Sequence, residues 1–294
     1  MLCFGNVRQT LFSQGKIERV ERFQSNFTTD RNIDIWLPID YDTTKKYSVV
    51  YMHDGQMLFD SSSTWNGLSW NLDQIASRLN QDPRIKPFIL VGIWNDPENR
   101  HADFFPKKPF DRLTAQEVDT VTSQLQIAGR TKKEFVPLSD SYLHFLIQEL
   151  MPWVRRNYAI SEKRKDTFLG GSSMGGLISI YAYLEYPKVF GGVFCMSTHW
   201  PGSFTLKNNP FPEAILSYLA QEIPILKKTK IYFDCGDQTL DALYPALQEE
   251  VDKLFLQKTR VKHRFVSKRF PGDEHSEKAW AKRVELPLRY LLSK

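Results

Sequence analysis

Runs of hydrophobic residues mark a series of strands along the chain. Residues 17–25 and 32–39 alternate hydrophobic and polar positions, which predicts an antiparallel pair joined by a turn at 28–31. Continuous apolar runs, such as those at 48–52 and 88–94, are typical of strands buried on both faces of a parallel sheet. The remaining strands are predicted at residues 166–170, 192–196, 230–235 and 260–268, which makes eight strands in all.

Hydrophobic residues at helical spacing separate these strands from the third one onward. The first predicted helix, at residues 70–79, places its apolar side chains on one face. The second, at residues 143–154, carries Pro152 in its last turn, where we expect a bend. Further helices are predicted after residue 174, through residues 240–254 and at residues 280–291. This alternation predicts a single α/β domain over residues 1–294.

One segment interrupts the alternation. Residues 95–138 contain no strong strand pattern and many charged residues. A connection of this length inside a compact α/β domain is usually a lid or a disordered loop. We therefore expect a charged, lid-like insertion at about residues 95–138.

Composition narrows the class of protein. The 294 residues are 41% hydrophobic and 25% charged, as in ordinary globular proteins, with a net charge of +5. The basic clusters at 130–133 and 163–165 are short and lack interleaved aromatic residues, so we expect no nucleic-acid partner. No apolar stretch is long enough to span a membrane, and residues 1–8 lack the hydrophobic region of a signal peptide. We expect a cytoplasmic protein, unless a leader has been removed, and the oligomeric state is left open.

A glycine-flanked serine follows the strand predicted at 166–170. Residues Gly171–Gly175 fit the G-x-S-x-G pattern, in which a serine sits on a strained strand-to-helix turn. Side chains two residues to either side of the serine would collide, which explains the two glycines. The alternative is a glycine-rich turn that only packs a helix on a strand. The first interpretation makes Ser173 a nucleophile.

The order of the polar residues favours the nucleophile. Serine needs a base, and the base needs an acid to fix its tautomer. In hydrolases with this turn, the order along the chain is serine, acid, histidine. Ser173 follows the fifth predicted strand, an acidic cluster follows the seventh, and His275 follows the eighth. All three would meet at the carboxyl edge of a parallel sheet, so we assign His275 as general base and acid.

The acid has two candidates, Asp241 and Asp237, which both lie beyond the strand at 230–235. We favour Asp241. It also begins a predicted helix, where a carboxylate is favoured by the helix dipole, so a purely structural role is the alternative.

The oxyanion of an acyl-transfer intermediate needs at least two N–H donors. The N–H of Met174 follows the nucleophile, and the loop after the third strand offers the N–H of Gln56 or, alternatively, of Met57. We expect His53, Asp54, His199 and Trp200 to line the substrate pocket. For Trp200, the alternative is a position in the hydrophobic core. The sequence has no metal-ligand motif, so we expect no metal site.

These motifs together resemble the putative-esterase branch of the α/β-hydrolases, which includes siderophore esterases, S-formylglutathione hydrolases, and feruloyl and acetyl-xylan esterases. The matching segments are Arg31–Pro38, Tyr51–Gln56, Gly170–Gly176, Ile231–Gly236 and Asp273–Ser276. The resemblance implies an α/β-hydrolase fold, with an eight-stranded, mostly parallel sheet, helices on both faces and no cofactor. It also implies ester hydrolysis through an acyl-enzyme on Ser173. Many relatives place the acid in a G-x-x-D turn, where this chain has Thr239.

The sequence therefore predicts a serine carboxylic-ester hydrolase that acts on a small-molecule ester. Within enzymes, the alternative is a siderophore-trilactone or acyl-thioester hydrolase. From another class, the alternative is a catalytically silent α/β-hydrolase that binds a ligand.

Overall fold

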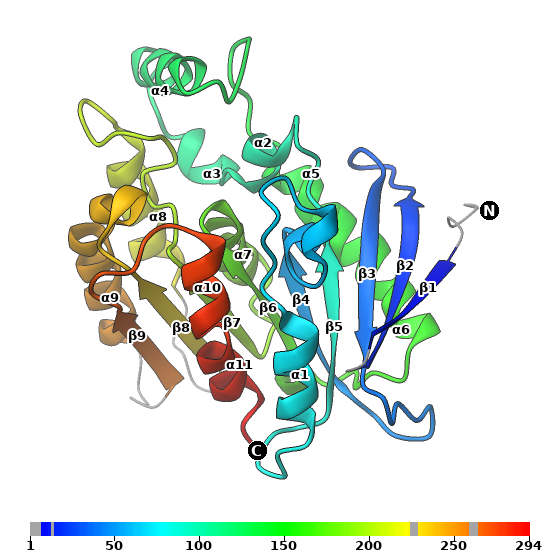
Figure 1. Cartoon of the computed structure of the whole chain (residues 1–294). Helices are drawn as coiled ribbons and strands as arrows, with labels where there is room; N and C mark the ends of the chain where they lie inside the picture. The colour runs from blue at the N-terminus through cyan, green and yellow to red at the C-terminus, as the bar shows by residue number, and fades with distance from the viewer. Residues whose placement is uncertain (1–6, 13–14, 224–228, 259–263) are drawn as a thin grey trace.

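A nine-stranded sheet runs through the computed structural model of the chain, which describes residues 7–12, 15–223, 229–258 and 264–294 (Figure 1). The spatial order of the strands is β1-β2-β3-β5-β4-β6-β7-β8-β9. Their bounds are β1 Val7–Phe12, β2 Gly15–Phe23, β3 Arg31–Leu37, β4 Ser48–His53, β5 Phe88–Ile93, β6 Thr167–Ser172, β7 Gly192–Met196, β8 Lys230–Cys235 and β9 Phe265–Arg269.

The strand pairing confirms the predicted mostly parallel α/β sheet. Strands β4 to β9 are parallel to one another, whereas β1, β2 and β3 form an antiparallel meander that joins β5. The sheet has one strand more than the eight predicted, because β1 pairs with β2 at its outer edge. Residues 260–263 of the last predicted strand lie outside the described residues.

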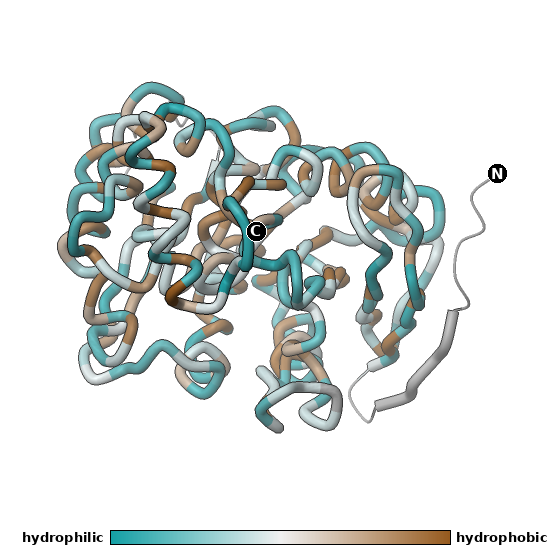
Figure 2. Tube along the Cα trace, turned by 90° about the horizontal axis from the view of Figure 1, so that it is seen from above, coloured by the Kyte–Doolittle hydropathy of each residue, from teal (hydrophilic) through white to brown (hydrophobic). Residues whose placement is uncertain are grey.

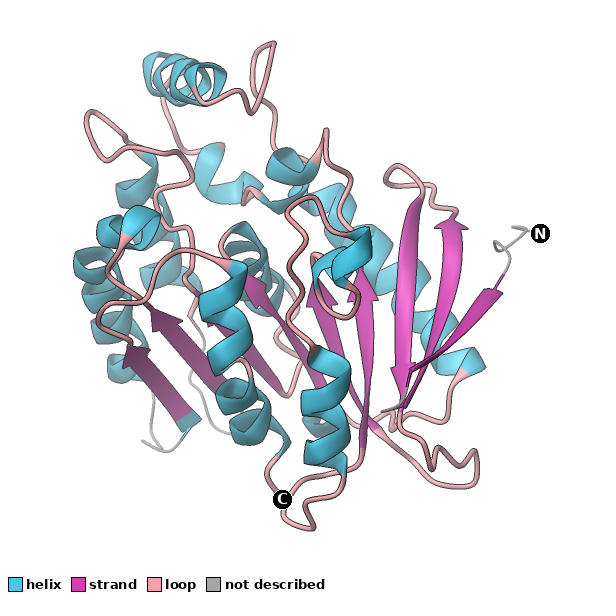
Figure 3. Ribbon diagram, viewed as in Figure 1, coloured by secondary structure: helices cyan, strands magenta, loops and turns pink. Residues whose placement is uncertain are grey.

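Helices cover both faces of the sheet (Figure 3). One face packs against α1 (Leu72–Asn80), α10 (Glu277–Arg283) and α11 (Glu285–Leu292). The other packs against α5 (Ser139–His144), α6 (Met151–Asn157), α7 (Met174–Glu185), α8 (Phe211–Glu222) and α9 (Pro245–Lys258). Along β4, Val50 and Met52 point to the face that packs against α1, α10 and α11. Val49 and Tyr51 point to the opposite face. This alternation explains the continuous apolar run of β4, since both of its faces are buried. Figure 2 colours the trace by hydropathy, and many of the outer loops are hydrophilic.

Two prolines change the helices from their predicted form. The helix predicted at 143–154 contains a π-helical stretch, Phe145–Leu150, directly before Pro152. A proline cannot donate a backbone hydrogen bond and its ring crowds the preceding turn, which a π-helical turn relieves. The helix predicted through 240–254 begins only at Pro245, and a 3₁₀ turn, η5 (Thr239–Leu243), precedes it.

The segment at 95–138 is largely helical. It contains α2 (Arg100–Phe104), α3 (Lys107–Phe110) and α4 (Ala115–Ile127), and these helices lie above the carboxyl ends of the strands (Figure 1). Side chains from all three helices and the loops between them reach the core: Phe104, Phe105, Phe110, Val121 and Leu125. The predicted insertion is therefore a packed cap over the carboxyl edge of the sheet.

The chain changes direction across the sheet between β4 and β6. These strands are parallel neighbours, and β4 leads through α1 to β5 on one side, whereas β6 leads through α7 to β7 on the other. The loops at their carboxyl ends therefore lead in opposite directions, and ligands of open α/β sheets bind at such a reversal. Within the part of the chain that the structure describes, no helix is long and apolar enough to cross a membrane.

Candidate active site

Ser173 occupies a strained turn between β6 and α7. Its backbone has φ 57° and ψ −124°, a conformation that is costly for any residue with a side chain. Glycine is required nearby, because a Cβ on Gly171 would lie 3.0 Å from the carbonyl carbon of Gly175. A Cβ on Gly175 would lie 3.3 Å from the Cβ of His53. The sequence pattern therefore encodes the turn that presents the Ser173 hydroxyl at the carboxyl edge.

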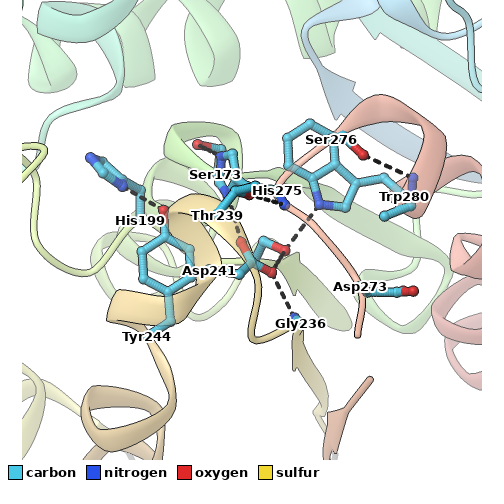
Figure 4. A network of polar contacts seen from close by, with 12 residues as sticks. Ser173, His199, Gly236, Thr239, Asp241, Tyr244, Asp273, His275, Ser276 and Trp280 are labelled. Atoms are coloured by element: carbon cyan, nitrogen blue, oxygen red, sulfur yellow. Dashed lines mark hydrogen bonds and ion pairs between the residues drawn. The ribbon is translucent and has the colours of Figure 1, made fainter. Parts of the chain in front are cut away.

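His275 reaches this hydroxyl from the loop between β9 and α10 (Figure 4). Its Nε2 lies 2.9 Å from Ser173 Oγ. The backbone N–H of His275 donates to Thr239 Oγ1 at 2.9 Å, so the threonine that stands in place of the G-x-x-D aspartate holds the loop that carries the histidine. The imidazole packs edge-on against Trp280, with ring centroids 4.8 Å apart, which fixes its plane.

Asp241 is the carboxylate that contacts His275. Its Oδ1 lies 2.5 Å from His275 Nδ1, and its Oδ2 accepts hydrogen bonds from Gly236 N and Ser197 Oγ, each at 2.6 Å. The side chain is fully buried. Asp241 lies within η5 and turns back toward the strands, so it does not cap a helix as the alternative interpretation required.

Asp237, the other predicted acid, lies elsewhere. Its carboxylate accepts hydrogen bonds from Gly272 N and from Gln238 Nε2, at 2.8 Å and 2.7 Å, on the exposed side of the loop. The structure therefore brings together Ser173, His275 and Asp241. An ionised carboxylate at Asp241 accepts a hydrogen bond from Nδ1–H of His275, which leaves the lone pair of Nε2 directed at the Ser173 hydroxyl.

A buried arginine that sequence patterns did not single out lies behind this carboxylate. The Arg283 guanidinium donates to Ser197 Oγ and to Asp273 Oδ2, each at 2.7 Å, and its Nε lies 3.2 Å from Asp234 Oδ1. Ser197 in turn donates to Asp241. Arg283 therefore connects the acid to two further carboxylates. Its position in a helix gives no signal of this role, because its partners come from β8 and two loops.

Asp234 gives a pH-dependent prediction. Burial raises the pKa of its carboxyl to about 6, although Arg283 beside it acts in the opposite direction. Since the folded pKa exceeds the unfolded one, the proton stabilises the fold at low pH, and this contribution is lost as pH rises from about 4 to 6. Between pH 4 and pH 7, the unfolding free energy of the wild type should fall relative to that of Asp234→Asn by about 2 kcal/mol.

Urea unfolding of both proteins at the two pH values measures this difference, and the other carboxyls cancel to first order. A difference that stays constant, or that grows with pH, would mean that Arg283 keeps Asp234 ionised and that the expectation is wrong.

Two loops supply the predicted oxyanion donors. The N–H of Met174 has no acceptor within its own helix, because it is the first residue of α7. In the loop after β4, η1 (Gly55–Met57) is packed against β5, since a Cβ on Gly55 would lie 2.5 Å from the carbonyl carbon of Gly92. The Met57 N–H already donates to the Asp54 carbonyl at 2.9 Å. That bond favours Gln56 over Met57 as the second donor.

The residues predicted to line the substrate are all buried. His53 Nδ1 lies 2.8 Å from the Tyr142 hydroxyl, and burial lowers the pKa of His53 to about 3. Asp54 forms two hydrogen bonds with Arg100, each at 2.7 Å, and thereby ties the cap to the loop after β4. Neither side chain is turned to solvent.

The two residues of the loop after β7 differ from each other. His199 lies beside the triad, where its backbone N–H donates to the Ser173 carbonyl and its Nδ1 lies 2.7 Å from the Tyr244 hydroxyl. Trp200 belongs to the core, with its Nε1 donating to Gln248 Oε1 at 2.9 Å and its ring packed on Phe233. The prediction that Trp200 lines the substrate is therefore replaced by the core position.

Nowhere in residues 7–12, 15–223, 229–258 and 264–294 do three or more His, Cys, Asp or Glu side chains gather in a way that could hold a metal ion. The chemistry available at the site is that of a hydroxyl, an imidazole, a carboxylate and backbone N–H groups.

The chain matches one protein family over most of its length. The model of the family described as "Putative esterase" matches residues 25–285. The uncharacterized protein YbbA of Bacillus subtilis is 26% identical over 173 residues, which are 58% of each chain. The ferri-bacillibactin esterase BesA of the same organism is 24% identical over 185 residues, 61% of this chain and 58% of its own. The chain thus spans less than two thirds of the length of these curated relatives.

Solved structures share the fold. An IroE-like serine hydrolase from Shewanella oneidensis has a TM-score of 0.65 at 19% identity, over 94% of this chain and 79% of its own. A ferulic acid esterase has a TM-score of 0.63 at 16% identity, over 95% and 98% of the two chains. Together with the sheet order, these similarities confirm the predicted α/β-hydrolase fold.

Proposed function

The chain belongs to the putative esterase family, and we propose that it is a serine carboxylic-ester hydrolase with Ser173, His275 and Asp241 as its catalytic residues. The observation that carries this proposal is the pair of short contacts on the two imidazole nitrogens of His275. One nitrogen lies 2.9 Å from Ser173 Oγ and the other 2.5 Å from Asp241 Oδ1.

The first half of the reaction forms the acyl-enzyme. His275 Nε2 takes the proton of the Ser173 hydroxyl while Oγ attacks the ester carbonyl carbon, and Asp241 stabilises the resulting imidazolium. The carbonyl oxygen becomes an oxyanion, held by the N–H groups of Met174 and Gln56. The intermediate then collapses, the bond to the alcohol oxygen breaks, and the imidazolium gives its proton to the departing alcohol.

The second half of the reaction frees the enzyme. A water molecule gives a proton to His275 and attacks the acyl carbon, and collapse of the second intermediate returns the proton to Ser173 Oγ. The products are an acid and an alcohol. No cofactor takes part in these steps.

The choice of substrate within this reaction class rests on the relatives. The ferri-bacillibactin esterase in B. subtilis and the enterobactin esterase FES of Shigella flexneri support a siderophore lactone as the alternative substrate. An acyl thioester would follow the same steps with a thiol leaving group. Comparing kcat/KM for a catecholate trilactone, an acyl thioester and an aryl ester ranks these substrates.

A fluorophosphonate probe tests the proposal against a silent ligand-binding protein. We expect one equivalent of probe on the peptide that contains Ser173, because His275 activates that hydroxyl. Ser172→Ala should still be labelled, whereas Ser173→Ala should not. Absence of labelling in the folded wild type would favour the silent binding protein.

A further inference from the structure

A wall of rings leads away from the catalytic imidazole. The Tyr244 ring centroid lies 5.6 Å from that of His275, and the His199 centroid lies 5.8 Å from that of Tyr244. Phe204 continues the wall, 5.3 Å from His199. Beyond it, the guanidinium carbon of Arg130 lies 4.9 Å from the Phe204 ring centroid. These contacts connect the imidazole of His275 to a cation of the cap.

The outer end of this wall is open to solvent. Tyr244 and His199 are buried, but Phe204 is 38% exposed and Arg130 is exposed as well. A cation stacked on an aromatic face in this way offers both an apolar surface and a positive charge.

Arg130 has no carboxylate partner within the described part of the chain. Burial and the neighbouring Arg100 both lower the pKa of its guanidinium, and no carboxylate acts against them. Arg100 differs, because Asp54 pairs with it through two hydrogen bonds. Of the two arginines beside the wall, Arg130 is therefore the one whose charge is left for a ligand.

His199 offers a polar atom on the same wall. Its Nδ1 is occupied by the Tyr244 hydroxyl, while its Nε2 is buried without a hydrogen-bond partner among the described residues. Figure 4 shows this second nitrogen turned away from Tyr244. Burial lowers the pKa of His199 well below its usual value, so the ring is neutral. A buried, unpartnered nitrogen beside an active site is explained most simply by a ligand atom that completes it.

The wall is held in place before any ligand arrives. Gln124, on α4, donates to the carbonyl of Lys207 at 3.1 Å and accepts from Ser203 Oγ at 2.7 Å. These bonds fix the loop that carries Phe204 against the helix that precedes Arg130. The backbone N–H of Arg130 donates to the Leu125 carbonyl at 2.8 Å. A preformed surface of this kind binds without a large ordering cost.

We propose that this wall is a specificity subsite for an aryl ester that carries a carboxylate or similar anionic group. The aromatic ring of the substrate lies along Phe204, its anionic group pairs with Arg130, and His199 Nε2 contacts a polar atom nearer the ester. The subsite rests on the proposed function for its place in catalysis. It adds a substrate class, namely acidic aromatic esters, to that function.

Matched esters that differ only in charge test the subsite. One pair is methyl 3-(4-carboxyphenyl)propanoate and its 4-carbamoyl counterpart, and the other is 4-carboxybenzyl acetate and 4-carbamoylbenzyl acetate. We expect kcat/KM to be about tenfold higher for the carboxylate in at least one pair, and this ratio to fall as ionic strength rises. Equal values within both pairs would overturn the proposal.

Arg130→Met should reduce that ratio to near one, and Arg130→Lys should keep part of it. Arg112→Met is the matched control. Arg112 is also an exposed arginine of the cap, and its guanidinium carbon lies 5.3 Å from the ring centroid of Tyr218. Unlike Arg130, it is not among the charges that lower the pKa of His199. A ratio that survives in Arg130→Met, or that falls equally in Arg112→Met, would contradict the assignment.

Binding of the esters to Ser173→Ala tests the subsite independently of the reaction. Calorimetric titration of this variant with the same esters should show the same preference for the carboxylate. If Ser173→Ala still hydrolyses the esters, the proposed function is wrong. The binding preference, and its loss in the double variant with Arg130→Met, then decides the subsite by itself.

Discussion

Replacing Ser173 with alanine should lower kcat for a simple aryl ester by about 10⁶-fold, in line with the loss seen when a triad nucleophile is removed. The physical reason is that no acyl-enzyme can form, so only the oxyanion donors and substrate positioning remain. The change removes one oxygen atom from a side chain that is 8% exposed, and it leaves the strained backbone of the turn as it was. We therefore expect thermal unfolding close to that of the wild type.

Ser172→Ala serves as the control for this measurement. Ser172 is the last residue of β6, adjacent in sequence and also buried, but it does not belong to the proposed triad. Its variant should keep most of the activity. If purified, folded Ser173→Ala hydrolysed the ester as fast as the wild type, Ser173 could not be the nucleophile.

Replacing Asp241 with asparagine should lower kcat by about 10⁴-fold near neutral pH. The wild-type carboxylate accepts from His275 Nδ1 on one oxygen and from Gly236 N and Ser197 Oγ on the other. An amide has only one oxygen, so its NH₂ group must face one of these donors. If it faces His275, it favours the wrong tautomer, and in either orientation it no longer stabilises the imidazolium.

Asp237→Asn is the matched control, because the same substitution is made four residues earlier in the same loop. Asp237 accepts from Gly272 N and Gln238 Nε2 and does not touch the imidazole, so the variant should keep activity within a few-fold of wild type. The pH–rate profiles of both variants, measured beside their circular dichroism spectra, distinguish lost catalysis from lost folding. Loss of activity in Asp237→Asn alone would contradict the proposed acid.

The order of elements was predictable because local periodicity encodes it. Strands such as β4 and β7 are buried on both faces, so their sequences are continuous apolar runs. The edge strand β1 was missed, as it begins in a polar segment, Val7–Phe12, whose pairing depends on β2. The start of α9 was missed by several residues because a 3₁₀ turn precedes Pro245 and leaves the apolar spacing unchanged.

The sequence by itself determined the strand-to-helix turn at Ser173. Its steric requirement, a glycine two residues to either side of the serine, lies within the five residues Gly171–Gly175. It also determined the chain order of serine, acid and histidine, which parallel strands convert into a common edge.

Only the tertiary structure showed that Asp241, and not Asp237, contacts His275. It also placed Trp200 in the core, Arg283 behind Asp241 and Arg130 on the ring of Phe204. Each of these depends on where a side chain points relative to elements far away in the sequence. That direction is set by the packing of the sheet and its helices, which no local pattern contains.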